Sequence, residues 1–230
     1  MELVLVDEEI TDRSIEVKEG ENLVLNLAAF KAFPGAKIDI RVARNASVTA
    51  AFADFSKGEG RFVLNVYLAG EGASCDWHLA ALSDGDSRKV FDTCVWHNVG
   101  HTTGNMSNYG ICRDESRLTF TGTSEIKKGS KFSTTRQSAK IIVFDPKCDG
   151  KCSPILNIDE NDVVASHAAI VGKLNEEHLF YLMSRGLSMD EAKRLITLGY
   201  MKPIEEFFVT DSLKEKIDAA IEGGLLYVRS

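Results

Sequence analysis

The chain has 230 residues, 44% of them hydrophobic and 27% charged, and its 34 acidic and 27 basic side chains give a formal net charge of −7. Such a composition is that of a soluble globular protein and excludes predominant disorder, and the length fits one large domain or one and a half ordinary ones. The acidic balance argues against a general nucleic-acid binder, and no apolar run approaches the roughly 18 residues of a membrane span. Because the start, MELVLVDEEI, also lacks the basic region of a secretory signal, we expect a cytoplasmic protein.

From Leu3 to about Val171 the pattern is one of short strands separated by turn residues. In 61–68, RFVLNVYL, every second residue from Phe62 to Leu68 is large and apolar, which is typical of a strand with one buried face. Ten of the 18 glycines fall between positions 58 and 129, between the expected strands. No helical pattern of 10–15 residues intervenes, so alternating βα units are not expected.

Two all-β architectures fit this pattern. A sandwich would use Asn-Gly or Asp-Gly hairpins and strongly polar outer positions, and Asp-Gly occurs at 84–85 and 149–150. A β-solenoid, whose coils stack like on like, suits the small polar residues of the second strand face, although no repeat at a fixed period is visible. Periodicity alone leaves both architectures open.

After the strands the pattern becomes helical. Asn175 is a predicted N-cap with Gly186 as the matching stop, and Ser188 with Glu191 is a predicted capping box whose helix would end at Gly199. The expected helices cover 176–185, 189–198 and a segment from Asp211 or Ser212 to Gly223-Gly224, with a short turn from Pro203 to Phe208.

The apolar side chains of this helical segment exceed what three short helices can bury among themselves. They are Leu179, Phe180, Leu182, Met183, Leu195, Ile196, Phe207 and Phe208. Some must pack on the β-part, which is the commoner arrangement, or on another protein.

The densest chemical cluster is 145–154, DPKCDGKCSP. Its Asp, Pro and Gly residues predict a turn, which would place Cys148 and Cys152 at an exposed bend. Lys147 and Lys151 flank the two thiols and would lower their pKa, favouring the thiolate that binds metals. The spacing of the cysteines fits one arm of a zinc site.

A second arm is missing, because His178 follows His167 at too great a spacing for a closed Cys₂His₂ site. Two thiolates and one imidazole with open positions better suit an incomplete site that a partner chain or exogenous sulfide completes. The alternatives are two surface thiols in a loop, and a lone structural histidine at His167 within the strand-like segment VVASHAAIVG.

The remaining cysteines have simpler interpretations. Cys75 and Cys94 each share a strand face with a tryptophan, and we interpret both as small buried hydrophobes. Cys112 is similar, although Arg113 beside it leaves a reactive role open. Neither a glycine-rich phosphate loop nor a strand–GxGxxG–helix pattern nor a G-x-S-x-G elbow occurs, which argues against a nucleotide hydrolase, a dehydrogenase and an α/β-hydrolase.

Longer stretches resemble a known family. The run VVASHAAIVGKLNEEHLFYLMSRGLSMDEAKRLITLGYMKPI closely resembles the C-terminal signature of the SufB/SufD family, scaffold proteins of the SUF iron–sulfur cluster assembly system. Upstream, HNVGHTTGNMSNYGICRDESRLTFTGTSEIKKGSKFSTTRQSAKIIVFD resembles the family's β-helical core and includes Gln137 before its last coils. The two stretches cover roughly residues 90–208.

This resemblance implies a right-handed parallel β-helix, here over residues 1–172, followed by a helical segment over 173–230. It implies a dimer formed through the β-helix and a SufC-like ATPase docked on the C-terminal helices, with a sulfur donor protein as a further partner. ATPase docking would account for the surplus of apolar residues in the helices. Because the family's larger N-terminal region is not matched, flavin is a doubtful cofactor.

The resemblance also implies a site for a nascent cluster at the dimer interface. The segment DPKCDGKCSPILNI is similar to the SufB segment with a lysine–cysteine pair and a proline six residues later, so Cys148 takes the position of the SufB cysteine. SHAAIVG is similar to the histidine segment of SufD, which gives His167 that role, and one chain with both suits a homodimer. Ser166 and Ala168 stand where SufB members usually have a glutamate, and Cys152 is an extra thiol that can replace Cys148 as ligand.

We therefore expect a scaffold without catalytic turnover of its own, on which Cys148, Cys152 and His167 hold a transient iron–sulfur cluster. The alternative is a zinc-binding interaction module on a β-solenoid, which would use the same cysteines. A carbohydrate-active solenoid enzyme would need carboxylates along one sheet face, whereas the acids of the β-part cluster at turns.

Overall fold

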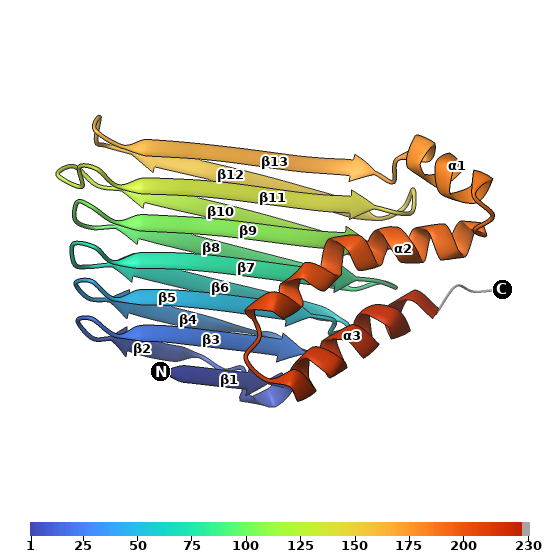
Figure 1. Cartoon of the computed structure of the whole chain (residues 1–230), viewed down its shortest axis with the longest axis horizontal. Helices are drawn as coiled ribbons and strands as arrows, with labels where there is room; N and C mark the ends of the chain where they lie inside the picture. The colour runs from blue at the N-terminus through green and yellow to red at the C-terminus, as the bar shows by residue number, and fades with distance from the viewer. Residues whose placement is uncertain (227–230) are drawn as a thin grey trace.

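The computed structural model describes residues 1–226 and is a flattened β-solenoid with helices at its C-terminal end (Figure 1). Successive strands alternate between two facing sheets, and every pair of neighbours within a sheet is parallel. The seven-stranded sheet contains, in spatial order, β1 (Glu2–Val6), β3 (Asn22–Ala29), β5 (Ser47–Asp54), β7 (Ser74–Ser83), β9 (Thr103–Cys112), β11 (Thr134–Val143) and β13 (Val164–Lys173). The six-stranded sheet contains β2 (Arg13–Val17), β4 (Gly35–Val42), β6 (Glu59–Leu68), β8 (Arg88–His97), β10 (Arg117–Ile126) and β12 (Asp149–Ile158). A short 3-10 helix, η1 (Asp7–Glu9), follows β1.

The length of the coil changes along the solenoid. Glu2 pairs with Val24, 22 residues later, whereas Thr103 pairs with Thr134, 31 residues later. Strands also lengthen, from five residues in β1 to ten in β13. This drift explains why the sequence shows no repeat at a fixed period although the fold is a solenoid.

The core lies between the two sheets and is built from columns of inward-facing side chains. Phe62, Phe91 and Phe120 occupy the same register on β6, β8 and β10, with ring centroids 6.5 Å and 5.8 Å apart. Trp77 from the facing sheet stacks on Phe62 at 5.9 Å. Stacked aromatic side chains bury large apolar areas and are among the strongest contributors to core stability.

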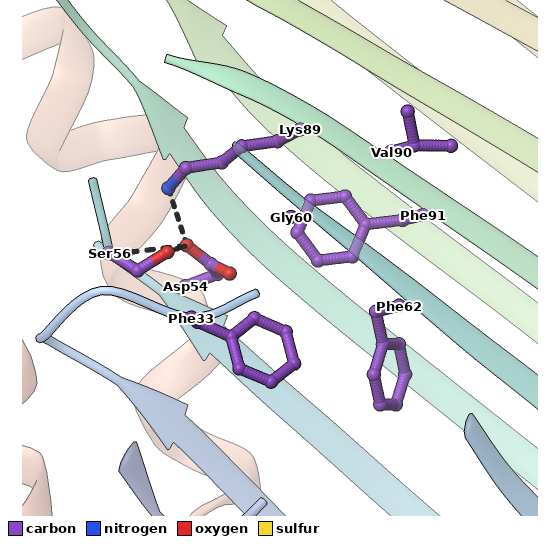
Figure 2. A pocket seen from close by; sticks show the side chains of 8 residues that line it. All are labelled: Phe33, Asp54, Ser56, Gly60, Phe62, Lys89, Val90 and Phe91. Carbon is purple, nitrogen blue, oxygen red and sulfur yellow. Dashed lines mark hydrogen bonds and ion pairs between the residues drawn. The ribbon is translucent and has the colours of Figure 1, made fainter. Parts of the chain in front are cut away.

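One corner of the solenoid contains a buried ion pair (Figure 2). Lys89 Nζ donates to Asp54 Oδ1 at 2.5 Å and to the Leu82 carbonyl at 2.8 Å. The Ser56 backbone N–H and hydroxyl donate to the same carboxylate oxygen at 3.0 Å and 2.8 Å. The charged groups are thus hydrogen-bonded, as burial in a low-dielectric interior requires.

The C-terminal helices are α1 (Glu176–Ser184), α2 (Met189–Met201), the 3-10 helix η2 (Lys202–Phe207) and α3 (Asp211–Leu226). Three of them, α2, η2 and α3, lie against the outer face of the seven-stranded sheet near the C-terminal ends of its strands (Figure 1). Alanines on that face let the helices approach closely; they are Ala28, Ala51, Ala53 and Ala80. The apolar helix residues packed with them are Met201, Ile204, Phe208, Leu213, Ile217 and Ile221.

The predicted starts of α1 and α2 are confirmed, α3 includes Asp211, one of the two residues predicted as its cap, and two of the predicted ends are wrong. The Asn175 side chain accepts hydrogen bonds from the backbone N–H groups of Glu177 and His178. Ser188 and Glu191 form the predicted capping box. However, α2 continues past Gly199 to Met201, and α3 continues past Gly223-Gly224 to Leu226. A helical glycine costs only about 1 kcal/mol, which burial of Met201 against the sheet outweighs. None of the helices within residues 1–226 is long and apolar enough to cross a membrane.

Candidate functional site

The last coil of the solenoid is open. Within residues 1–226, β12 pairs only with β10 and β13 only with β11, so each sheet ends in a ten-residue strand with one free edge. The inward side chains of these strands have no further coil to cover them, and most residues of β13 are exposed. Several exposed apolar residues lie here: Ile155, Ile158, Val164, Ile170 and Val171.

His167 lies in this open coil. It pairs in register with Gln137, which pairs with Met106, and Met106 pairs in turn with Trp77. The side chains of Gln137, Met106 and Trp77 are buried in the interior, so His167 continues an inward-facing column. His167 itself is exposed because the column ends there. A strand position that would be core in any earlier coil therefore presents an imidazole at the open end.

Cys152 lies on the facing sheet of the same coil. It pairs with Phe120 and so continues the column of phenylalanines. The prediction of a turn over 145–154 is wrong here, because the turn is confined to residues 144–148 and Cys152 is the fourth residue of β12. Pro154 is compatible with this strand because its missing N–H falls on an edge strand.

The Cys152 thiol is not activated by its neighbours. Lys151 points to the opposite face of β12, as successive strand residues do, and burial raises the pKa of Cys152 to about 11. The prediction that flanking lysines favour the thiolate is therefore wrong for this residue. In the isolated chain Cys152 is a protonated thiol at neutral pH.

Cys148 is in the corner before β12 and is 9% exposed, so the prediction of an exposed bend is wrong for it. Its Sγ donates to the carbonyl oxygens of Asp145 at 3.0 Å and of Cys112 at 3.1 Å. Lys147 extends away from it and forms an ion pair with Glu115 at 2.5 Å. Stacking of this corner on the one below turns the thiol inward, a constraint that local turn residues do not reveal.

A single chain does not gather the three predicted donors. Cys152 and His167 are in the same open coil on facing sheets, while Cys148 is held in the corner. Over the part of the chain that the structure describes, no three His, Cys, Asp or Glu side chains are grouped so as to hold a metal ion. The geometry is that of separate donors at an open end.

Cys112 is buried, as predicted, and the structure adds that its thiol lies beside that of Cys148. Its Sγ donates to the carbonyl oxygens of Ser116 at 3.2 Å and of Asp149 at 3.6 Å. Burial raises the pKa of Cys112 to about 12, and the neighbouring Cys148 thiol adds to the increase. The sequence signal that could have revealed this position is that Ser83 and Ser87 have the same separation as Cys112 and Ser116. This equal separation marks equivalent corners of successive coils.

Two other cysteines can be compared with their interpretations. Cys75 is buried, as predicted, and burial strongly raises its pKa. Cys94 was wrongly interpreted as buried: it lies with Trp96 on the outer face of β8, because the inward set of that strand includes Phe91 and Val95.

The interior just below the open coil is polar. His97 Nδ1 is 2.8 Å from the Thr102 hydroxyl, and burial lowers the pKa of His97 to about 4, so the ring is neutral at pH 7. Gln137 Nε2 donates to Ser124 Oγ at 2.8 Å and to the Ile155 carbonyl at 3.0 Å. The glutamine beneath His167 thereby ties β12 to the coil below.

The fold and the open coil together define a two-sheet β-solenoid protein that presents thiol and imidazole donors at one end and folds its C-terminal helices back on one sheet. The family model described as the SufBD core domain of SUF system FeS cluster assembly matches residues 23–200, and the chain belongs to this SufB/SufD family.

Individual relatives agree with this assignment. The iron–sulfur cluster assembly protein SufD of Bacillus subtilis is 31% identical over 155 residues, which are 67% of this chain and 36% of the relative. SufD of Escherichia coli is 27% identical over 135 residues, 58% of this chain and 32% of the relative. SufB of Bacillus subtilis is 26% identical over 149 residues, 64% of this chain and 29% of the relative. The chain spans about a third of the length of these relatives.

Proposed function

We propose that this protein is a scaffold component of iron–sulfur cluster assembly. It would build a nascent cluster, its cargo, at an interface between two copies of the chain, with a SufC-like ATPase as partner and without catalytic turnover of its own. The observation that carries the proposal is the open last coil, whose two facing strands carry Cys152 and His167, in a chain of the SufBD core family. Thiolate and imidazole are ligands that iron accepts.

Two features of the open end support a second copy as the missing cover. The free edges of β12 and β13 each present a row of backbone donors and acceptors, and long uncovered edges are pairing surfaces. The exposed apolar side chains flank these edges, among them Ile170 and Val171. A two-fold axis at this end would cover both and would bring two sets of donors together.

The donor set follows from this arrangement. Each chain would contribute Cys152 and His167 directly, so that two chains would supply four ligands where a single chain offers only two. Cys148 would join them as thiolate after its corner opens, because in the closed corner its Sγ is occupied by two carbonyl oxygens. A sulfur donor protein would supply the sulfide.

The ATPase would dock on α1, which has no buried residue and lies beyond the end of β13 (Figure 1). Phe180, Tyr181 and Met183 of this helix are exposed, and Met189 and Leu195 of α2 are exposed near it. An exposed cluster of aromatic and aliphatic side chains of this kind suits a protein interface. The nucleotide cycle of the ATPase would then twist the dimer and open the interface between the last coils.

Anaerobic reconstitution with ferrous iron and sulfide tests the proposal. We expect thiolate-to-iron absorption, its loss in the double variant Cys148→Ala/Cys152→Ala, and a reduced cluster content in His167→Ala. The matched control is Cys94→Ala, which removes a partly buried thiol from the outer face and should bind as much cluster as the wild type. Unchanged cluster content in the double variant, or one tightly bound zinc without labile sulfide, would refute the proposal.

A further inference from the structure

We propose that Cys112 and Cys148 are a redox-active dithiol, which a glutathione disulfide couple oxidises to a disulfide between the end of β9 and the corner before β12. The thiol chemistry is independent of the proposed function. Its consequence for cargo binding rests on that function, because Cys148 is one of the proposed donors.

The first observation is that the two thiols bridge the same two segments in both directions. Cys148 Sγ donates to the carbonyl of Cys112, and Cys112 Sγ donates to the carbonyl of Asp149, the residue that follows Cys148. Both side chains are at least nine-tenths buried and belong to the same interior cluster. Each sulfur is therefore held against the chain segment that carries the other.

The second observation is that an earlier corner has the same hydrogen bonds made by serines. Ser83 pairs in register with Cys112, and its hydroxyl donates to the Arg117 carbonyl at 3.2 Å. Ser116 occupies the position below Cys148, and its hydroxyl donates to the Ser83 carbonyl at 2.8 Å. Serine hydroxyls can therefore make the hydrogen bonds that hold such a corner. The two cysteines differ from them in that their sulfur atoms can be oxidised to a disulfide.

No other cysteine competes for this pairing in the folded chain. Cys75 is buried on β7, and Cys94 lies on the outer face of β8. Cys152 is four residues farther along the extended strand that begins after Cys148. The corner thus selects one pair among the five cysteines.

The reaction balances with glutathione disulfide as the oxidant. One protein thiol loses its proton to solvent, and the thiolate attacks glutathione disulfide and releases one glutathione thiolate. The second protein thiolate then attacks the mixed disulfide, forms the Cys112–Cys148 bond and releases the second glutathione, and the two released protons yield two glutathione thiols. Since both thiols are buried and lie against carbonyl oxygens, the exchange needs the corner to open and will be slow in the closed chain.

The disulfide would change the last coil in two ways. It would tie the start of β12 to the end of β9, and it would remove Cys148 from the thiolates available to a cluster. Cys152 and His167 would stay free, so oxidation would lower the cluster content of the site while leaving part of its donor set in place.

Thiol mapping of the metal-free full chain tests the proposal. The protein is equilibrated with glutathione redox buffers of increasing disulfide content, from the reduced and from the oxidised side, then acid-quenched, alkylated and mapped by peptide mass spectrometry. We expect the loss of two thiols per chain and a Cys112–Cys148 cross-linked peptide, and neither in Cys112→Ser or Cys148→Ser. Both variants should keep the wild-type thermal unfolding midpoint, because serine already fills the equivalent positions.

Five free thiols at every buffer composition, or a cross-link that includes Cys75, Cys94 or Cys152, would overturn the proposal. A cluster reconstitution of pre-oxidised protein separates this outcome from failure of the proposed function. We expect the oxidised wild type to bind less cluster than oxidised Cys112→Ser. If neither reduced protein binds a cluster, the proposed function fails while the thiol map still decides the dithiol.

Discussion

Replacing Lys89 by methionine should destabilise the solenoid strongly. The side chains of Lys89 and Asp54 are 2% and 1% exposed, so the variant leaves a buried carboxylate whose Oδ1 keeps only the two donors of Ser56. Removing one partner of a buried ion pair costs about 3–5 kcal/mol. Since domains of this kind unfold with a free energy of about 5–15 kcal/mol, the loss is a large share of the total.

The assay is urea unfolding followed by tryptophan fluorescence, because the buried Trp77 stacks on Phe62, which lines the same small cavity as Lys89 and Asp54. The midpoint should fall at an unchanged slope, and the thermal midpoint should fall by roughly 6–20 °C at about 2–4 °C per kcal/mol. The matched control is Lys131→Met, whose partner Asp162 and own side chain are 52% and 56% exposed, and an exposed pair is worth about 0–1 kcal/mol. If both variants lost the same free energy, the buried pair would not be what stabilises this corner.

Three further results are expected. Because burial lowers the pKa of His97 to about 4, the unfolded chain binds a proton near pH 6.5 that the folded chain binds only near pH 4. The stability contribution of the neutral ring is complete above pH 6.5 and falls by on the order of 3 kcal/mol between pH 6.5 and pH 4. Urea unfolding should show the upper part of this loss between pH 7 and pH 5 in the wild type and not in His97→Gln. Alkylation of Cys152 by iodoacetamide in metal-free protein should accelerate about tenfold per pH unit up to about pH 11, and a plateau below pH 9 would contradict its burial. Phe180→Ser should leave unfolding unchanged and weaken binding of a SufC-like ATPase in titration calorimetry, whereas Phe132→Ser, an exposed aromatic in a turn of the solenoid, should leave that binding intact.

Features set by neighbours in the sequence could be predicted. The alternation in 61–68 gives the correct inward face of β6, and Asn175 and Ser188 cap helices where expected, because caps depend on residues two or three positions away. The resemblance to a known family then decided between sandwich and solenoid, which periodicity could not do while the coil grew from 22 to 31 residues.

Features set by the stacking of coils could not be predicted in the same way. Cys148 is buried because the residue below it is the inward-facing Ser116, and Cys94 is on the outer face because strand register and not a neighbouring tryptophan fixes its side. Likewise, α2 passes Gly199 because Met201 has a sheet to pack against. In each of these cases the prediction used neighbouring residues in the sequence, whereas the structure is decided by contacts between residues far apart in the sequence.

The state of the thiols links the open coil to its proposed cargo. Cys152 is protonated because burial raises its pKa, and the Cys148 thiol is held in the closed corner against two carbonyl oxygens, so neither is presented as a free ligand in the isolated chain. A bound metal supplies the positive charge that stabilises a thiolate, and binding then releases the thiol proton. Cluster binding would therefore be coupled to opening of the corner and, in the proposed dimer, to arrival of the second chain, which would supply the remaining ligands. The same burial that shields the cysteines in the single chain would then make cargo binding depend on assembly.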